Sequence, residues 1–474
     1  MERKWWTLIA VVTGVFMLLL DVTIVNVALP DIERSLDASL ADLQWVIDAY
    51  ALTLAALLLT AGSLADLYGR RRTFAVGIVV FTLGSALCGA AQSPLFLTLS
   101  RAFQGVGGAI MFSTSLALLS SAFRAGDRGT AFGVFGAVTG VAVAVGPVIG
   151  GALVSWLSWR WIFFVNIPVG VGALFLTLTK VDESRNPHAR HVDIVGLVTF
   201  SAGLAGLVYG LIRSNEVGWG SGEVVFSFVA SAVLLVAFVI AETRVREPML
   251  DLSLLRKPTF VGGLIAAFAI SASLFAAFPY LVLYLQGMLG LSAIEVGVRF
   301  LVLSGPIFVT AAVAGRLSDK VPTSLLIGPG FAFIGVALLL MRGITVTDDF
   351  SHLVPGFILA GVGAGLVNVP LASTAVGVVE PARAGMASGI NSTLRQVGIA
   401  TGVAALGAIF SHHADPSSRN PQGFVDGLNA ILLVGATLAL VAAVTSLVLI
   451  RRSDFHVATA DEGAPAGTVV RSGA

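Results

Sequence analysis

The sequence predicts an all-α integral membrane protein whose chain crosses the bilayer fourteen times. Of its 474 residues, 56% are hydrophobic and only 12% are charged, whereas an average soluble domain is about 25% charged. Long apolar stretches recur along the chain, and short polar segments separate them. Lysine and arginine are concentrated in every second polar segment. Together these observations exclude an ordinary water-soluble protein.

Each apolar stretch is a candidate transmembrane helix, because such a helix needs about 20 mostly apolar residues. The first stretch is too long for a signal-peptide core and lacks a small-residue cleavage site, so we expect it to remain in the mature protein. In chain order, the predicted spans are 6–30, 43–64, 73–91, 95–123, 130–157, 167–181, 193–212, 224–241, 260–285, 293–314, 325–341, 353–379, 386–410 and 425–450.

The positive charges predict which side of the membrane the chain ends face. With fourteen spans, 20 of the 28 Lys and Arg residues fall on the side of the two termini and 5 on the opposite side. The other 3 are arginines within spans. Because positively charged loops remain on the cytoplasmic side, we predict a multi-pass protein of the cell membrane with both termini in the cytoplasm.

The chain also repeats itself weakly at an offset of about 256 residues. The Gly-Val-Gly run at 105–107 then aligns with the same run at 361–363, and 62–66 aligns with 315–319 at an offset of 253. Two related six-helix halves around a central site are typical of secondary transporters. The predicted units are an N-terminal half at 1–190, an inserted helix pair at 191–257, a C-terminal half at 258–452 and a disordered cytoplasmic tail at 453–474.

Five segments are specific enough to indicate a family. Residues 20–30 read LDVTIVNVALP, 62–72 read GSLADLYGRRR, 101–109 read RAFQGVGGA, 146–151 read GPVIGG and 159–168 read WRWIFFVNIP. In this order they resemble the signatures of the fourteen-helix drug:proton antiporters of the major facilitator superfamily. The resemblance implies the major facilitator fold, with two six-helix halves and two inserted helices. It also implies export driven by the proton gradient, without a cofactor.

Asp21 is the sharpest single candidate, because inserting an acid near a helix centre costs about 2.5 to 3.5 kcal/mol. Burial favours the neutral form of a carboxyl group, which suits a residue that alternately holds a proton and a cationic substrate. The family resemblance implies the same role. The alternative is a structural ion pair or a helix-packing hydrogen bond. Asn26 lies some 140° further around the helix, so we expect it to hydrogen-bond a neighbouring helix.

Arg101 places a guanidinium inside an apolar span and needs a carboxylate or carbonyl partner. Gln104, three residues later, shares its helix face. The resemblance assigns this arginine a part in proton coupling, and a purely structural network is the alternative. Phe357 occupies the corresponding position in the second half, so we expect any such function to be confined to the first half.

Two motifs are candidates for gating. Asp66 could bond helix N-terminal N–H groups and a basic side chain in one conformation and release them in the other. With Gly69 and Arg70 it would form a gate latch, although the arginines could serve only as topology anchors. Leu67 departs from the basic residue usual in this motif, which puts any contact from that position in doubt.

The second gating motif lies in the predicted span at 130–157. Gly146, Gly150 and Gly151 would let this helix approach a neighbour closely, and Pro147 would bend it. Close packing between the two halves would then seal one side of a central cavity.

Other polar residues are candidates for lining the substrate cavity. Asp48 with Trp45 and Tyr50 could form a mouth that recognises cations, or the two aromatic residues could belong to the interfacial belt. Glu295 and Arg299 are spaced i, i+4, for which we expect a mutual salt bridge.

The span at 386–410 carries the last two candidates, Asn391 and Arg395, which match the family pattern for this helix. Arg395 must find a partner, and whether that partner is substrate stays open.

The remaining composition excludes other classes of protein. A net charge of +1 argues against nucleic-acid binding, and one cysteine, Cys88, excludes a disulfide or a multi-cysteine metal site. The six histidines fall in loops, at span ends or in the tail, and no ATP-binding P-loop is present. We therefore expect neither an enzyme nor an ATP-driven pump, and no metal or obligate protein partner.

The sequence thus favours a proton-coupled exporter of small amphipathic, including cationic, compounds that works by alternating access in the lipid bilayer. Two alternatives remain open. One is a dedicated exporter of an endogenous antibiotic, siderophore or lipid on the same fold. The other is an uncoupled uniporter or a transporter-like sensor.

Overall fold

The computed structural model confirms the all-α membrane fold. It describes residues 2–123, 125–184, 193–245, 248, 250, 252–318, 321–379, 384–413, 421–451 and 454. Within these ranges, thirteen helices are long and apolar enough to cross a membrane, and α5 adds a shorter apolar helix, Val145–Trp156. Together they match the fourteen predicted spans.

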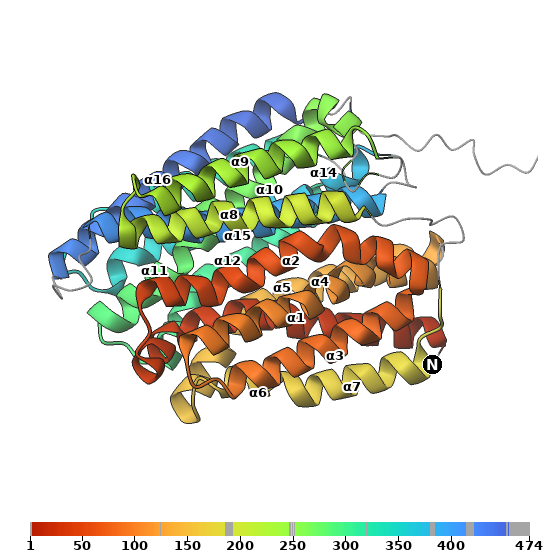
Figure 1. The fold of residues 1–474 in the computed structure, drawn as a ribbon, viewed down its shortest axis with the longest axis horizontal. Helices are drawn as coiled ribbons and strands as arrows, with labels where there is room; N and C mark the ends of the chain where they lie inside the picture. The colour runs from red at the N-terminus through yellow and green to blue at the C-terminus, as the bar shows by residue number, and fades with distance from the viewer. Residues whose placement is uncertain are drawn as a thin grey trace, which may run out of the picture.

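The helices run along one common direction (Figure 1). Their bounds are α1 Arg3–Leu36, α2 Leu40–Tyr68, α3 Arg70–Gly89, α4 Pro94–Ala122, α5 Ala125–Trp156, α6 Trp161–Phe164, α7 Asn166–Lys180, α8 Ile194–Val217, α9 Gly222–Glu242, η1 Leu252–Arg256, α10 Pro258–Ser273, η2 Phe275–Ala277, α11 Phe278–Leu283, η3 Tyr284–Met288, α12 Ala293–Leu317, α13 Ser324–Met341, η4 Phe350–Leu353, α14 Val354–Gly377, α15 Ala384–His413 and α16 Pro421–Leu449.

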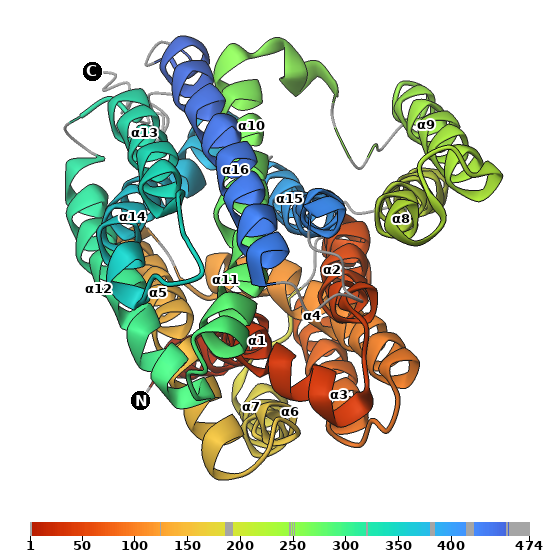
Figure 2. The same cartoon turned by 90° about the vertical axis from the view of Figure 1, so that its left-hand side faces the viewer.

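Helices α1–α7 lie together, and so do α10–α16 (Figure 2). Between these two groups, α5 packs along α12 and α2 packs along α15. The pair α8 and α9 stands at the edge of the bundle, where α8 contacts α2 and α15. The predicted boundary between 190 and 191 lies outside the described residues.

The span that begins at Pro258 is not a continuous α-helix. Pro279 has no backbone N–H and cannot bond back to the preceding turn, and the chain passes through the 3-10 segment η2 just before it. The π-helical segment η3 follows α11. Within it, Gln286 Nε2 donates to the Val27 carbonyl of α1 at 2.8 Å. A broken helix therefore meets the first helix between the two groups.

Contacts between the two groups join helix ends that lie far from the N-terminus. Gln44 Nε2 donates to Tyr280 Oη at 3.0 Å, and the Ile294 N–H donates to Ser155 Oγ at 3.0 Å. Gln44 is near the start of α2, Ser155 at the end of α5 and Ile294 at the start of α12. These bonds close the bundle at the end opposite the N-terminus.

The N-terminal end of the bundle carries ion pairs instead. Arg3 pairs with Asp182, and Lys4 Nζ lies 2.7 Å from Asp127 Oδ2. The Arg70 N–H donates to the Ser184 carbonyl at 2.8 Å. The chain start, the α2–α3 loop, the start of α5 and the end of α7 therefore share one end, as the distribution of positive charge predicts.

Candidate functional site

A buried polar network lies inside the first group of helices and centres on Asp21 of α1. Arg101 Nη1 of α4 donates to Asp21 Oδ2 at 2.6 Å. Gln104 Nε2 and Asn166 Nδ2 donate to Asp21 Oδ1 at 2.9 and 3.1 Å. All four side chains are at most 2% exposed. The carboxylate thus meets three donors from two other helices.

Arg101 is equally well satisfied, as its position in an apolar span requires. Its Nη1 also donates to Gln104 Oε1 at 2.6 Å, and its Nε donates to the Val46 carbonyl at 3.3 Å. The guanidinium carbon lies 4.1 Å from the centre of the Tyr50 ring. The prediction of a carboxylate or carbonyl partner for Arg101, with Gln104 on the same face, is confirmed.

Sequence reasoning missed two members of this network. Ser85 Oγ of α3 accepts from Gln104 Nε2 at 2.7 Å and from Asn166 Nδ2 at 3.1 Å. Asn166 is the first residue of α7. Asn166 stands in the WRWIFFVNIP motif, which was a signal, whereas nothing distinguishes Ser85 from other serines in apolar spans. Together they connect α3 and α7 to the ion pair.

The ion pair is the geometry that the structural alternative for Asp21 predicts. It leaves proton coupling by Asp21, Arg101 and Gln104 as a prediction. Chemically, the arrangement can act as a switch, because a proton on Asp21 would remove the counter-charge of a guanidinium that is fully enclosed.

Asp48, Trp45 and Tyr50 do not form the cation-recognising mouth that we expected. Asp48 and Tyr50 are two residues apart on α2 and therefore point to nearly opposite sides of the helix. Tyr50 packs under Arg101, while Trp45 lies 6.2 Å from the ring of Tyr209 on α8. Asp48 is fully buried, and neither of its carboxylate oxygens has a hydrogen-bond partner among the described residues.

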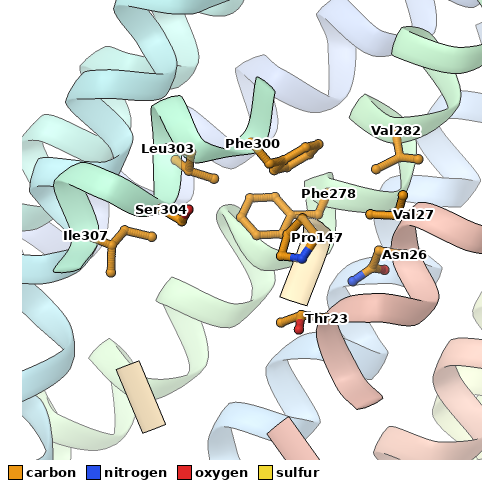
Figure 3. A pocket seen from close by; sticks show the side chains of 10 residues that line it. All are labelled: Thr23, Asn26, Val27, Pro147, Phe278, Val282, Phe300, Leu303, Ser304 and Ile307. Carbon is orange, nitrogen blue, oxygen red and sulfur yellow. The ribbon is translucent and has the colours of Figure 1, made fainter. Parts of the chain in front are cut away.

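A pocket lies between α1, α5, α11 and α12, where the two groups of helices meet (Figure 3). The rings of Phe278 and Phe300 sit edge to face at 5.7 Å. Ser304 supplies a hydroxyl that has no hydrogen-bond partner among the described residues. The residues that line the pocket are Thr23, Asn26, Val27, Pro147, Phe278, Val282, Phe300, Leu303, Ser304 and Ile307. The lining is mostly apolar and aromatic, with a few polar groups.

Asn26 lines this pocket, but its predicted bond to a neighbouring helix is wrong. Its Nδ2 donates to the Val22 carbonyl of its own helix at 3.3 Å. The side chain folds back by one turn because the pocket, rather than another helix, lies in front of it.

The glycines of α5 bring this helix against two neighbours, not one. A Cβ at Gly146 would collide with Thr23 of α1, and one at Gly150 would press on Ile24. A Cβ at Gly151 would collide with the backbone of α12, and one at Gly297 of α12 would collide with the Pro147 carbonyl. Helix α5 therefore ties α1 to α12 beside the pocket, where gating by these residues remains a prediction.

The proposed latch is only partly within the described structure, because the Asp66 side chain lies outside it. Gly69 has a φ of +105°, which favours glycine, and a Cβ there would collide with the Glu183 carboxylate. Arg70 Nη1 donates to the Ala117 carbonyl at 3.4 Å. These contacts hold the α2–α3 loop against α4 and the chain that follows α7.

The predicted salt bridge between Glu295 and Arg299 is wrong. The Glu295 carboxylate instead accepts from N and Oγ of Ser292 at 2.8 Å, as part of a capping box at the start of α12. Arg299 Nη1 donates to the Glu295 carbonyl at 3.3 Å, and the guanidinium carbon lies 5.5 Å from the centre of the Phe350 ring. The backbone N–H groups at the start of a helix have no acceptor within the helix. The Glu295 carboxylate therefore bonds the N-cap residue instead of Arg299.

Arg395 lies in the second group of helices and has a different environment from Arg101. Its Nη2 donates to Asn368 Oδ1 of α14 at 2.6 Å. The described residues place no carboxylate within 4.0 Å of this guanidinium. Asn391, one turn earlier on α15, is 5% exposed and its Nδ2 has no partner there either.

A family model described as Major Facilitator Superfamily matches residues 11–403. The puromycin resistance protein pur8 of Streptomyces alboniger is 37% identical over 473 residues, which cover 97% of this chain and 93% of that protein. The multidrug resistance protein Stp of Mycobacterium tuberculosis is 38% identical over 409 residues, covering 85% and 75%.

Among solved structures, the human organic anion transporter MFSD10 matches with a TM-score of 0.65 at 16% sequence identity. The match covers 94% of this chain and 100% of that one. At this level of identity the likeness shows the fold alone.

Proposed function

The chain belongs to the major facilitator superfamily, and from this premise we propose that it is a proton-coupled antiporter that exports small amphipathic compounds, cations among them. It is a transporter and not an enzyme. The names of its relatives pur8 and Stp describe antibiotic and multidrug resistance, which supports the outward direction of transport. Proton coupling is the part of the proposal that rests on the site.

The observation that carries it is the enclosed pair of Asp21 and Arg101. A buried ion pair adds little stability compared with apolar residues of the same volume, so retaining one in a lipid-embedded bundle favours a functional reason. When Asp21 takes up a proton, Arg101 loses its counter-charge and the bonds from α4 and α7 to α1 weaken. Protonation of Asp21 can therefore change how α1 is held against α4 and α7.

Helix α1 also provides the route from the proton to the pocket. Asp21 and Thr23 are two residues apart and face nearly opposite sides of the helix. Asp21 points into the network, whereas Thr23 lines the pocket and packs on Gly146 of α5. A shift of α1 that follows protonation would change the pocket and the α1–α5–α12 contact together.

Asp48 is the second acid in this proposal. It is fully buried on α2 without a hydrogen-bond partner in the described structure. It lies one turn after Gln44, which bonds Tyr280 between the two groups of helices. We assign it to the cationic substrate, whose positive charge would satisfy this carboxylate when a proton does not.

The orientation of the chain in the membrane follows from charge. The positive-inside rule puts the end that carries Arg3, Lys4 and Arg70–Arg72 in the cytoplasm, so the end closed by Gln44–Tyr280 faces outward. Each proton that enters gains about 2.3 kcal/mol per 100 mV of membrane potential, which can drive a compound out against its gradient.

Purified protein in liposomes with an acidic lumen tests the proposal, with ethidium as the external probe. We expect protons leaving the lumen to drive ethidium in, and an ionophore that collapses the pH gradient to stop it. Asp21→Asn keeps the size of the side chain and should abolish the gradient-driven uptake while the protein elutes as a folded species. Ethidium movement that ignores the gradient, or an Asp21→Asn variant with unchanged uptake, would contradict the proposal.

A further inference from the structure

Arg395 presents a positive charge inside the second group of helices that no described residue neutralises. The guanidinium has five N–H donors, and the described residues offer it one acceptor, Asn368 Oδ1, at 2.6 Å. The orientation of that amide is fixed, because Asn368 Nδ2 donates to the Ala364 carbonyl at 3.0 Å. No carboxylate of the described chain lies within ion-pair distance of Arg395.

A second unused donor lies beside it. Asn391 precedes Arg395 by four residues on α15, so the two side chains share a helix face. The Asn391 Nδ2 is buried and has no hydrogen-bond partner among the described residues. The cluster formed by Asn368, Asn391 and Arg395, which we call the Arg395 cluster, therefore has spare donors.

The face that carries the Arg395 cluster points into the bundle. Gly398 and Gly402 lie on the same face of α15. A Cβ at Gly398 would collide with the Phe268 carbonyl of α10, and one at Gly402 would press on Ala272. Arg395 is nonetheless partly exposed, so these packing contacts do not enclose its guanidinium completely.

The position of Arg395 along α15 makes an unmatched charge there costly in free energy. Arg395 is eleven residues from the start of α15 at Ala384, which puts it about 16 Å along the helix. The hydrocarbon core of a bilayer is about 30 Å thick, so the guanidinium lies near its middle. A buried charge needs a counter-charge and hydrogen-bond partners. The described residues give Arg395 one hydrogen-bond acceptor and no counter-charge.

We propose that the Arg395 cluster is a subsite for an anionic oxygen group of the substrate, namely a carboxylate. A guanidinium matches the two oxygens of a carboxylate with two parallel N–H donors, and the Asn391 amide adds a third donor. This inference rests on the proposed export function and extends its substrates to amphipathic compounds that bear a carboxylate.

The charges of the two groups of helices complement one another for such a substrate. Among the described residues, Asp48 of α2 has no hydrogen-bond partner and Arg395 of α15 has no counter-charge. These two helices pack along each other. Gln44 of α2 lies against Gly407 of α15, which places Asp48 nearer the closed end of the bundle than Arg395. A compound with a cationic and a carboxylate group satisfies both.

Rhodamine B and its ethyl ester provide a matched pair of probes, because both carry the same cation and only the acid carries a carboxylate. In liposomes with an imposed pH gradient, the initial rate for each dye is measured and the acid-to-ester ratio is compared between variants. Arg395→Gln removes the charge-assisted hydrogen bonds to the carboxylate, so we expect the ratio to fall at least about tenfold, which corresponds to about 1.4 kcal/mol. Arg342→Gln, which removes a loop arginine, should leave the ratio unchanged.

Asn368→Asp tests the same subsite without removing the guanidinium. It replaces the amide oxygen at 2.6 Å with a carboxylate, so the protein would supply its own counter-charge. The acid-to-ester ratio should fall in this variant too. This arm remains informative if Arg395→Gln fails to fold, because the new ion pair replaces an unmatched charge.

Three results would overturn the subsite: equal loss of both dyes in Arg395→Gln, an unchanged ratio in Asn368→Asp, or a wild type that moves the ester but not the acid. If wild type moves neither of these dyes nor ethidium, the export proposal itself fails. Binding of each dye to the purified protein then decides the subsite. Tighter binding of the acid that Arg395→Gln abolishes supports it, and equal binding of acid and ester overturns it.

Discussion

In the first half the Asp21 carboxylate meets an arginine and two amides, whereas in the second half Arg395 meets one amide oxygen. The contrast extends to the aligned position of Arg101, which Phe357 occupies. Phe357 packs between the rings of Phe300 and Phe350 at 5.4 and 5.7 Å. The Asp21 network of the first half is therefore neutralised, whereas the second half combines an aromatic core with an arginine that no described residue neutralises. We infer that the Asp21 network serves coupling and that Asp48 and the Arg395 cluster serve recognition of the charges of the substrate.

Removing Arg101 should have the largest effect on stability. In Arg101→Leu the Asp21 carboxylate stays buried without its counter-charge, so we expect the free energy of unfolding to fall by about 3 to 5 kcal/mol. Thermal unfolding in detergent would measure it. In the double variant Asp21→Asn/Arg101→Leu, stability should recover while gradient-driven transport stays lost. A double variant as unstable as the single one would contradict the switch interpretation.

The second-largest effect is expected at the contact between α1 and α5. Gly146→Ala places a methyl group on Thr23, and overpacking of this kind costs about 1 to 3 kcal/mol. Gly172→Ala on α7 is the matched control, because nothing lies within 4 Å of a Cβ there and alanine favours a helix. We expect lower stability and slower transport in the first variant and no loss in the second. Equal behaviour would mean that the close approach is unimportant.

Neutralising the unmatched charge of Asp48 should raise the stability of the protein, whereas the two preceding changes should lower it. Asp48→Asn removes a buried charge that has no hydrogen-bond partner in the described structure, so we expect unfolding to cost about 1 kcal/mol more. Ethidium uptake should fall in the same variant, because its counter-charge is gone. Asp426→Asn, on the exposed side of α16, is the control for the change of charge. A destabilised Asp48→Asn would show that the carboxylate is satisfied.

The smallest predicted effect concerns a feature that the two halves share. Ser39 and Asp42 form a capping box at the start of α2, and Ser292 and Glu295 form one at the start of α12. The two serines are related by the offset of 253 that also relates the α2–α3 loop to its second-half copy. Ser39→Ala and Ser292→Ala should each cost about 1 kcal/mol. Thermal unfolding that shows clearly unequal losses would mean that the repeat does not extend to the helix caps.

The fold followed from hydropathy because lipid requires every spanning segment to satisfy its own backbone. Asp21, Arg101 and Gln104 were also accessible, since charged and amide side chains stand out in apolar stretches. Ser85 did not stand out, because small hydroxyl residues bond their own helix in most spans. Whether these side chains form one network depends on which helix faces pack together. The pattern of a single sequence does not show which faces meet.

The errors have a common cause. Asp48 and Tyr50 are close in sequence, but helical geometry places them on nearly opposite faces of α2. Glu295 was paired with Arg299 by spacing, although the helix start competes for the carboxylate. The break before α11 could have been predicted from Pro279, whereas the bond from Gln286 to α1 could not.

The residues that follow α7 affect the order in which the first half can form during translation. The Glu183 carboxylate accepts from the backbone N–H groups of Arg71 and Arg72 at 3.0 and 3.2 Å, so it caps the start of α3 from 112 positions downstream of Arg71. During translation, α3 enters the membrane long before its cap exists. The first half can therefore complete this end of its bundle only after the ribosome has passed residue 184.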